Sequence, residues 1–300
     1  MHGVIHFIYH ALLTLGSVVR RIVRAVWMFT PPAFCKDWQV WPPAPIAVPS
    51  AGRTRSRNVD GDLLGLLIAT SIPAGAIVPV LPRGVVLPPG VGANDPYPIS
   101  IAFGYQHDVR SELFPSLPGS NYLEFAVGVS GLRLAAPING FSGPCAILGR
   151  LDLNELLPIV LGRLLGLQKV LRVANTEENA FDLRSFWRKS MVAAGSLTRV
   201  GEPVRASDCA GLAPLMATFD QPVVSRSITG ALAFTGFTWH WDRGLAQPVR
   251  CRTEIVQGFA QGLYVYPPEP GAGTACTGAW QIRVPWTMAA FQDPASFVRR

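Results

Sequence analysis

Short apolar segments separated by proline and glycine make up most of the chain after about residue 58. These segments are rich in Val, Ile, Phe and Tyr, and such a composition between turn residues is typical of β-strands rather than helices. We therefore expect an α+β fold that is mainly antiparallel β, a sheet or barrel with one or two helices. The expected strands lie at 63–70, 76–81, 99–105, 122–134, 145–150, 191–200, 228–239, 249–256, 259–266 and 279–288.

One segment has a helical period instead. Its apolar side chains recur every three or four positions, as they do on one face of an α-helix, and they are Leu153, Leu156, Leu157, Val160, Leu161, Leu164 and Leu165. Asp152 is suited to cap the start of this helix, with Glu155 three residues later, and Gly166 is suited to end it. The next segment, KVLRVA, reads as a strand in which Lys169 and Arg172 face opposite sides.

The first 57 residues differ from the rest of the chain. An apolar run at 4–19 is followed by arginines, and residues 30–57 are rich in proline. The run is shorter than the roughly 18 residues expected of a membrane-spanning helix. We expect 1–57 to form an N-terminal amphipathic helix and a Pro-rich linker, and 58–300 to form one domain. The helix at 4–29 would lie on a membrane surface, or else pack on the body or on a neighbouring subunit.

Composition argues against several classes of function. Charged residues are 15% of the chain and hydrophobic ones 49%, so the chain is globular rather than disordered. The net charge of +7 comes from scattered arginines without dense basic and aromatic stretches, which argues against nucleic-acid binding. The five cysteines are widely spaced and include no C-x-x-C pair. We therefore expect no metal, no cofactor, no disulfide framework and a reducing, cytoplasmic location.

Lysine is rare in this chain, and one lysine has an unusual setting. Only three of the 26 basic residues are lysines, and Lys169 lies in the otherwise apolar stretch LLGLQKVL. Burying an ammonium group without a partner is costly, so such a lysine often has a lowered pKa or takes part in chemistry. A lysine at a strand start is otherwise a residue that reaches solvent or forms a salt bridge.

The order of several pieces resembles the acetoacetate decarboxylase family and its wider superfamily. In that family an early V-P-x-P-like element is followed by a strand with Tyr-x-Glu, an Asp, a helix closing on Gly-Arg, and then a lysine. The corresponding pieces here are AIVPVLP at 76–82, YLEFAVGV at 122–129, Asp152, LGRLLG at 161–166 and Lys169, and GAWQIRVPWTM at 278–288 resembles the closing strand.

The resemblance implies a closed, cone-like β-barrel that assembles into homo-oligomers. Lys169 would be the Schiff-base lysine and Glu124 its acidic partner, with Tyr122, Arg163 and Arg57 contacting a small-molecule oxo acid. The family carries a second lysine directly after the first, whereas this chain has Val170. Desolvation, or a remote arginine, would then have to lower the pKa of Lys169.

Three functions remain open from the sequence. The first is a Schiff-base lyase, a decarboxylase or an aldolase-type enzyme, that acts on a β-keto or related oxo acid. The second is a non-catalytic barrel that binds an apolar small molecule or lipid at a membrane surface, which the missing second lysine favours. The third is a metal-independent carbohydrate- or pigment-modifying enzyme in which the lysine has lost its role.

Overall fold

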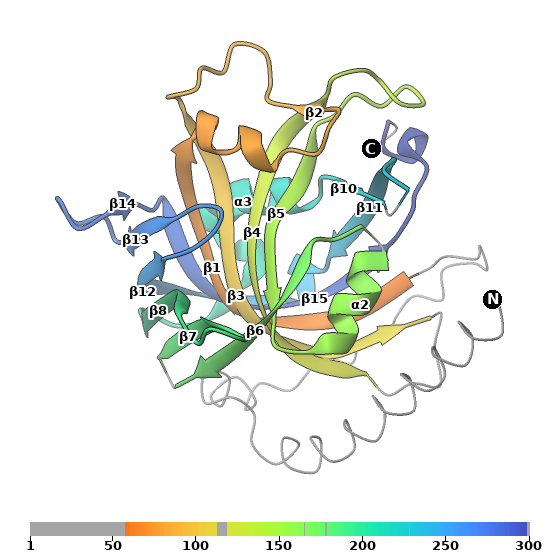
Figure 1. The fold of residues 1–300 in the computed structure, drawn as a ribbon. Helices are drawn as coiled ribbons and strands as arrows, with labels where there is room; N and C mark the ends of the chain where they lie inside the picture. The colour runs from red at the N-terminus through yellow and green to blue at the C-terminus, as the bar shows by residue number, and fades with distance from the viewer. Residues whose placement is uncertain (1–57, 113–118, 165, 178, 228, 299–300) are drawn as a thin grey trace.

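The computed structural model describes residues 58–112, 119–164, 166–177, 179–227 and 229–298, and strands dominate it (Figure 1). The strands are β1 (Asn58–Pro73), β2 (Val85–Val86), β3 (Pro96–Ser111), β4 (Ser120–Leu134), β5 (Cys145–Leu153), β6 (Lys169–Thr176), β7 (Ala180–Ser185), β8 (Met191–Arg199), β9 (Val204–Arg205), β10 (Val223–Arg226), β11 (Leu232–Trp239), β12 (Leu245–Ile255), β13 (Gly262–Tyr266), β14 (Thr274–Ala275) and β15 (Gly278–Ala289). The α-helices are α2 (Leu156–Leu164) and α3 (Ala213–Phe219), and the short 3-10 helices are η2 (Ala74–Ala76), η3 (Val78–Val80), η4 (Ala206–Asp208), η5 (Ala210–Leu212), η6 (Trp241–Arg243) and η7 (Pro294–Phe297).

Nine strands close into a mixed β-barrel, as the sequence predicts. Its wall runs β15-β1-β3-β4-β5-β6-β7-β8-β12 and returns to β15 through the β12–β15 pairing. Its neighbours are antiparallel except β5 and β6, which are parallel. A parallel pair needs a crossover connection, usually a helix, and α2 supplies it here. The crossover brings Lys169 beside Leu151 in the wall.

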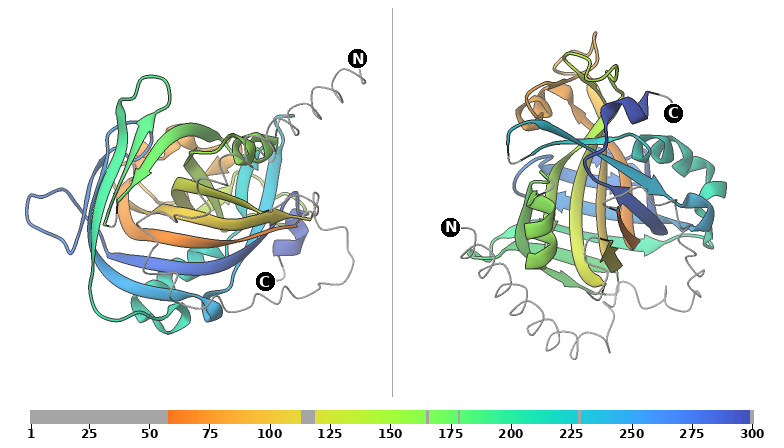
Figure 2. Two further views of the ribbon diagram at one scale, coloured as in Figure 1. Left: turned by 90° about the horizontal axis from the view of Figure 1, so that it is seen from below. Right: turned by 90° about the vertical axis from the view of Figure 1, so that its right-hand side faces the viewer.

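A second set of pairings crosses the outer face of this wall. β10 pairs with β5 and with β11, and β11 pairs with β15. The strands β15, β1, β3, β4 and β5 are therefore shared by two closed rings, one on each of their faces. Figure 2 shows these long curved strands, with α2 and α3 on different sides of them.

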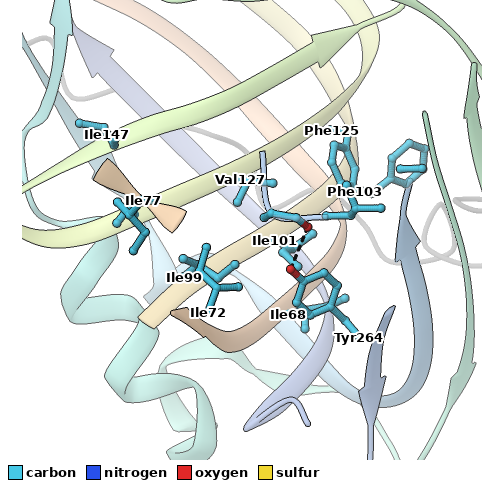
Figure 3. Packing of buried hydrophobic residues seen from close by; sticks show 14 of the residues in the cluster. Ile68, Ile72, Ile77, Ile99, Ile101, Phe103, Phe125, Val127, Ile147 and Tyr264 are labelled. Carbon is cyan, nitrogen blue, oxygen red and sulfur yellow. Dashed lines mark hydrogen bonds between the residues drawn. The ribbon is translucent and has the colours of Figure 1, made fainter. Parts of the chain in front are cut away.

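The first ring is filled with side chains. Its core contains Ile68, Phe103 and Phe125 from the shared strands (Figure 3). The Phe103 and Phe181 rings stack with centroids 3.9 Å apart, and the Tyr264 hydroxyl donates to the Ala260 carbonyl at 2.8 Å. Aromatic pairs of this kind stabilise a core beyond the area that they bury. This interior is the packed core of the domain.

Two predictions from the local sequence are wrong. Residues 76–81 are not a strand but 3-10 turns, because Pro79 has no N–H to donate to a sheet. Asp152 does not cap a helix: it lies inside β5, is 1% exposed and accepts from Arg150 at 2.5 Å and from Arg172 at 3.0 Å. Helix α2 begins only at Leu156.

The expected helix and linker at 1–57 lie outside the described residues. The first strand that the structure describes begins at Asn58. Within the described part of the chain, no helix is both long and apolar enough to span a membrane.

Candidate active site

A cavity of about 530 Å³ lies on the face of the shared strands that looks away from the packed core. Along this face β3 and β4 carry small residues, whereas their other face carries the large core residues Ile101, Phe103 and Phe125. Small side chains leave the space above the sheet unfilled. The small lining residues are Ser100, Ala102, Gly104, Ala126 and Gly128.

Lys169 enters this cavity as the first residue of β6. Its residue is only 7% exposed, whereas the next residue, Val170, is 37% exposed on the other side of the strand. Arg163, near the end of α2, donates from Nε to the Lys169 carbonyl at 2.9 Å and fixes the backbone there. The side chain runs past Gly162, whose missing β-carbon leaves room for the lysine methylenes. The crossover helix therefore sets the position of the amine.

Glu124 is the acidic partner of this amine. Its Oε2 lies 3.7 Å from Lys169 Nζ, and the Tyr122 ring centroid lies 5.8 Å from the same nitrogen. Burial lowers the pKa of Lys169 below its ordinary value of 10.5, while the charge and hydrogen bonding of Glu124 act in the opposite direction. Burial raises the pKa of the Tyr122 hydroxyl, and the Glu124 charge adds to this effect. Desolvation thus favours the neutral amine, the form that can act as a nucleophile.

A line of hydrogen bonds holds Glu124 in place. Gln106 Nε2 donates to Glu124 Oε1 at 3.2 Å, and Trp286 Nε1 donates to Gln106 Oε1 at 2.9 Å. A side-chain amide has one acceptor and one donor end, so the indole N–H fixes which end of Gln106 faces the carboxylate. The indole reaches across β1 because Gly61 stands opposite Trp286, and a β-carbon at Gly61 would lie 3.0 Å from the ring.

The cavity holds few charges. The charged residues in its described lining are Lys169, Glu124 and Arg110, and Arg110 is held at the exposed rim by Asp108 at 2.8 Å. Arg172, which the strand alternation places on the opposite face from Lys169, bonds Asp152 within β5 instead. Desolvation is therefore the main cause of the lowered pKa of Lys169, and no cation among the described residues contributes to it.

The structure brings together three of the five residues predicted to form a site. Lys169, Glu124 and Tyr122 line one cavity. Arg163 is exposed and supports the Lys169 backbone, and it is not among the residues that line the cavity. Arg57 lies outside the described residues.

Sequence reasoning missed Gln106 and Trp286. The signal that was present is the alternation of β3, where Ser100, Ala102 and Gly104 alternate with large apolar residues and lead to Gln106 on the same face. Residues that could hold a metal do not gather: in the described part of the chain, no cluster of three or more His, Cys, Asp or Glu side chains is suited to that role.

Comparison with known proteins shows a shared fold. No protein-family model matches the chain, and no curated protein matches its sequence. Among solved structures, the enduracididine biosynthesis enzyme MppR complexed with pyruvate is 12% identical, with a TM-score of 0.53, over 84% of this chain and 98% of that one. An acetoacetate decarboxylase from Legionella pneumophila is 14% identical, with a TM-score of 0.48, over 83% and 91% of the two chains.

An acetoacetate decarboxylase-like enzyme from Sphingomonas wittichii is also similar, with 9% identity, a TM-score of 0.49, and coverage of 79% of this chain and 91% of that one. The resemblance inferred from the ordered sequence motifs is confirmed as a likeness of fold. At such low identity the likeness says nothing of activity. The chain is therefore a closed barrel that shares its fold with MppR, and its chemistry has to be argued from the cavity.

Proposed function

We propose that this protein is a Schiff-base-forming carbon–carbon lyase, a decarboxylase or aldolase-type enzyme that acts on an oxo acid through Lys169. One observation carries the proposal: a lysine of depressed pKa lies buried in a cavity with a carboxylate 3.7 Å from its amine. Perturbed titratable groups in a cavity are typical of functional sites. The barrel of MppR, a structural neighbour, has been solved with pyruvate, an oxo acid.

The first chemical step uses the neutral amine. Its lone pair attacks the substrate carbonyl carbon, a C–N bond forms, and the carbonyl oxygen leaves as water, which gives a protonated imine. The protonated imine is an electron sink: when the bond between the α-carbon and the leaving group breaks, its electron pair forms a double bond to the imine carbon, the C=N electron pair moves onto nitrogen, and an enamine results. In a decarboxylation the released group is carbon dioxide, and in an aldol cleavage it is a carbonyl compound.

Glu124 is placed to manage the protons of these steps. It lies beside the amine and can take a proton from the attacking nitrogen and return one to the enamine carbon. The bond from Gln106 keeps one carboxylate oxygen occupied, so the other oxygen faces the amine. Water release and imine stability both benefit from a cavity with few polar groups.

Borohydride trapping tests this proposal directly. The full-length protein is incubated with a panel of oxo acids, reduced with sodium borohydride, digested and mapped by mass spectrometry. We expect an adduct on the peptide that contains Lys169, and none on the Lys169→Ala variant. Lys189→Ala is the matched control, because Lys189 lies outside the cavity and stacks on Phe186 at 5.2 Å. A folded protein that gives no Lys169 adduct with any carbonyl compound would show the proposal to be wrong.

A second candidate function has an observation of its own. The Lys169 amine already has a carboxylate partner, and most of the cavity wall is apolar. A paired lysine and an apolar cavity lining are sufficient for a barrel that binds an apolar small molecule without reacting with it. Binding without a trapped adduct would favour that function.

A further inference from the structure

Four aromatic rings line the cavity from elements other than β4 and β6, the strands that carry Glu124 and Lys169. Phe219 comes from α3, Phe237 and Trp239 from β11, and Trp286 from β15. All four line the cavity, and we call them the aromatic wall. Phe237 and Trp239 stack at 6.1 Å, Phe219 meets Trp239 edge to face at 5.1 Å, and Trp239 lies 6.4 Å from Trp286.

This wall is not fully covered by the protein. Trp286 is 6% exposed, but Phe219, Phe237 and Trp239 are only partly buried although they face a cavity. Aromatic side chains supply a large apolar area, and protein interiors normally cover it. Incompletely covered apolar rings that line a concave site are typical of ligand pockets.

The wall and the amine belong to one continuous site. An ion pair joins Lys169 to Glu124, and hydrogen bonds continue from Glu124 through Gln106 to Trp286, a member of the aromatic wall. The strands of Glu124 and Trp286, β4 and β15, are separated by β3 and β1. The site therefore extends over four strands, and a short-chain oxo acid bonded to Lys169 would contact only part of it.

The volume and the charges of the cavity agree with a larger ligand. At about 530 Å³ it falls within the range of pockets that enclose drug-sized molecules. Apart from Lys169, the cation in its described lining is Arg110, which Asp108 already occupies at the rim. Recognition energy in the interior must then come mainly from apolar contact.

From these observations, and resting on the proposed function, we infer that the substrate carries a ring-bearing apolar body that packs on the aromatic wall while its carbonyl reaches Lys169. The ligand class is an aryl or polycyclic oxo compound. Contacts with Phe219, Phe237 and Trp239 position the ring of the substrate. The affinity then depends on this apolar body rather than on a carboxylate group of the substrate.

A matched pair of ketones tests the inference on the full-length protein. Butanone and benzylacetone carry the same methyl ketone, and only the second has a phenyl ring. Borohydride trapping on Lys169 is measured against ketone concentration. We expect half-maximal labelling at an about ten- to a hundredfold lower concentration of benzylacetone, the gain from burying a ring-sized apolar group. Equal concentrations for the two ketones would overturn the inference and leave the proposed function standing.

Two substitutions locate the effect. Trp239→Ala should remove most of the preference for benzylacetone, and Phe219→Leu, a milder change, should reduce it. Trp187→Ala is the matched control: Trp187 is 87% exposed between β7 and β8, outside the cavity, and its loss should leave the preference unchanged. A preference that survives both wall substitutions in folded protein would contradict the inference.

A non-reacting probe separates the inference from the proposed function. The alcohol obtained by reducing benzylacetone keeps the ring but cannot form an imine. Calorimetric binding of this alcohol that Trp239→Ala weakens would support the ring site even if neither ketone were trapped, in which case the proposed chemistry alone would be wrong. If the alcohol does not bind and the two ketones label alike, the ring site does not exist.

Discussion

The Lys169 side chain packs directly on Gly162, at a distance that leaves no room for a β-carbon on the glycine. A β-carbon on Gly162 would lie 2.4 Å from Lys169 Cδ and 2.5 Å from Cε. The glycine belongs to the crossover helix α2 and the lysine to the strand that follows it. Because Gly162 has no side chain, the methylene groups of Lys169 can pass between helix α2 and the cavity.

Gly162→Ala should therefore impair the site without unfolding the protein. Alanine is favoured over glycine in a helix by about 1 kcal/mol, so the thermal midpoint should change little, but the lysine methylenes must move. We expect the rate of borohydride trapping on Lys169 to fall at least about tenfold, since sub-ångström placement of reacting groups governs such rates. Val160→Ala on the same helix is the control, because Val160 is 48% exposed. Unchanged trapping in Gly162→Ala would contradict this account.

The reactivity of Lys169 should depend on pH in a defined direction. Burial lowers its pKa, so the rate of labelling should rise with pH and reach its half-maximum below pH 10.5. Glu124 raises the pKa of Lys169, and Glu124→Gln should therefore move the half-maximum to still lower pH. Labelling kinetics over a pH series, with peptide mapping, measure both values. A shift to higher pH in Glu124→Gln would show that the carboxylate does not act on the amine in this way.

The same shift links pH to stability. Between the lowered pKa of Lys169 and its ordinary value of 10.5, the unfolded chain binds more protons than the folded one. The contribution of Lys169 to the free energy of unfolding therefore increases as pH rises through that window. Lys169→Met removes this titrating group, so the rise of stability with pH across that window should be smaller in the variant than in the parent protein, and denaturant unfolding over a pH series checks this.

Local patterns predicted most of the long strands and singled out Lys169, but they did not predict the cavity around it, the strand β7 or the 3-10 turns at 76–81. The alternation in β3 and β4 is visible in the sequence, and the ordered motifs pointed to Lys169 and Glu124. Gln106 and Trp286 meet only because β1 lies between their strands and Gly61 stands opposite the indole. The contact between Gln106 and Trp286 cannot be predicted from their spacing along the chain. Asp152 shows the reverse case, in which a valid local capping signal was overridden by two arginines brought together in the folded chain.

Gln106 should affect both stability and the reactivity of Lys169, because it hydrogen-bonds to Trp286 and to Glu124. Gln106→Leu leaves the Trp286 N–H buried without its acceptor, at a cost of about 1–3 kcal/mol, and frees Glu124 to move. We expect lower stability together with a changed pH profile of Lys169 labelling. The control is Gln247→Leu, because Gln247 donates to the Gly201 carbonyl on the exposed surface. If Gln106→Leu loses stability but keeps the pH profile of the parent, the residue is structural only.

Among these variants we expect the largest loss of stability from a substitution of Asp152, which pairs with two arginines. Asp152 is 1% exposed and accepts from Arg150, which is itself buried, and from Arg172. Removing one partner of a buried ion pair leaves an uncompensated charge and typically costs about 3–5 kcal/mol, so Asp152→Ala should lower the free energy of unfolding by that amount. Asp182→Ala removes a comparable bond to Arg184 at 3.0 Å, but that pair is more exposed and should cost no more than about 1 kcal/mol. Denaturant unfolding of both variants gives the comparison. Equal losses would mean that Asp152 does not compensate the buried arginine.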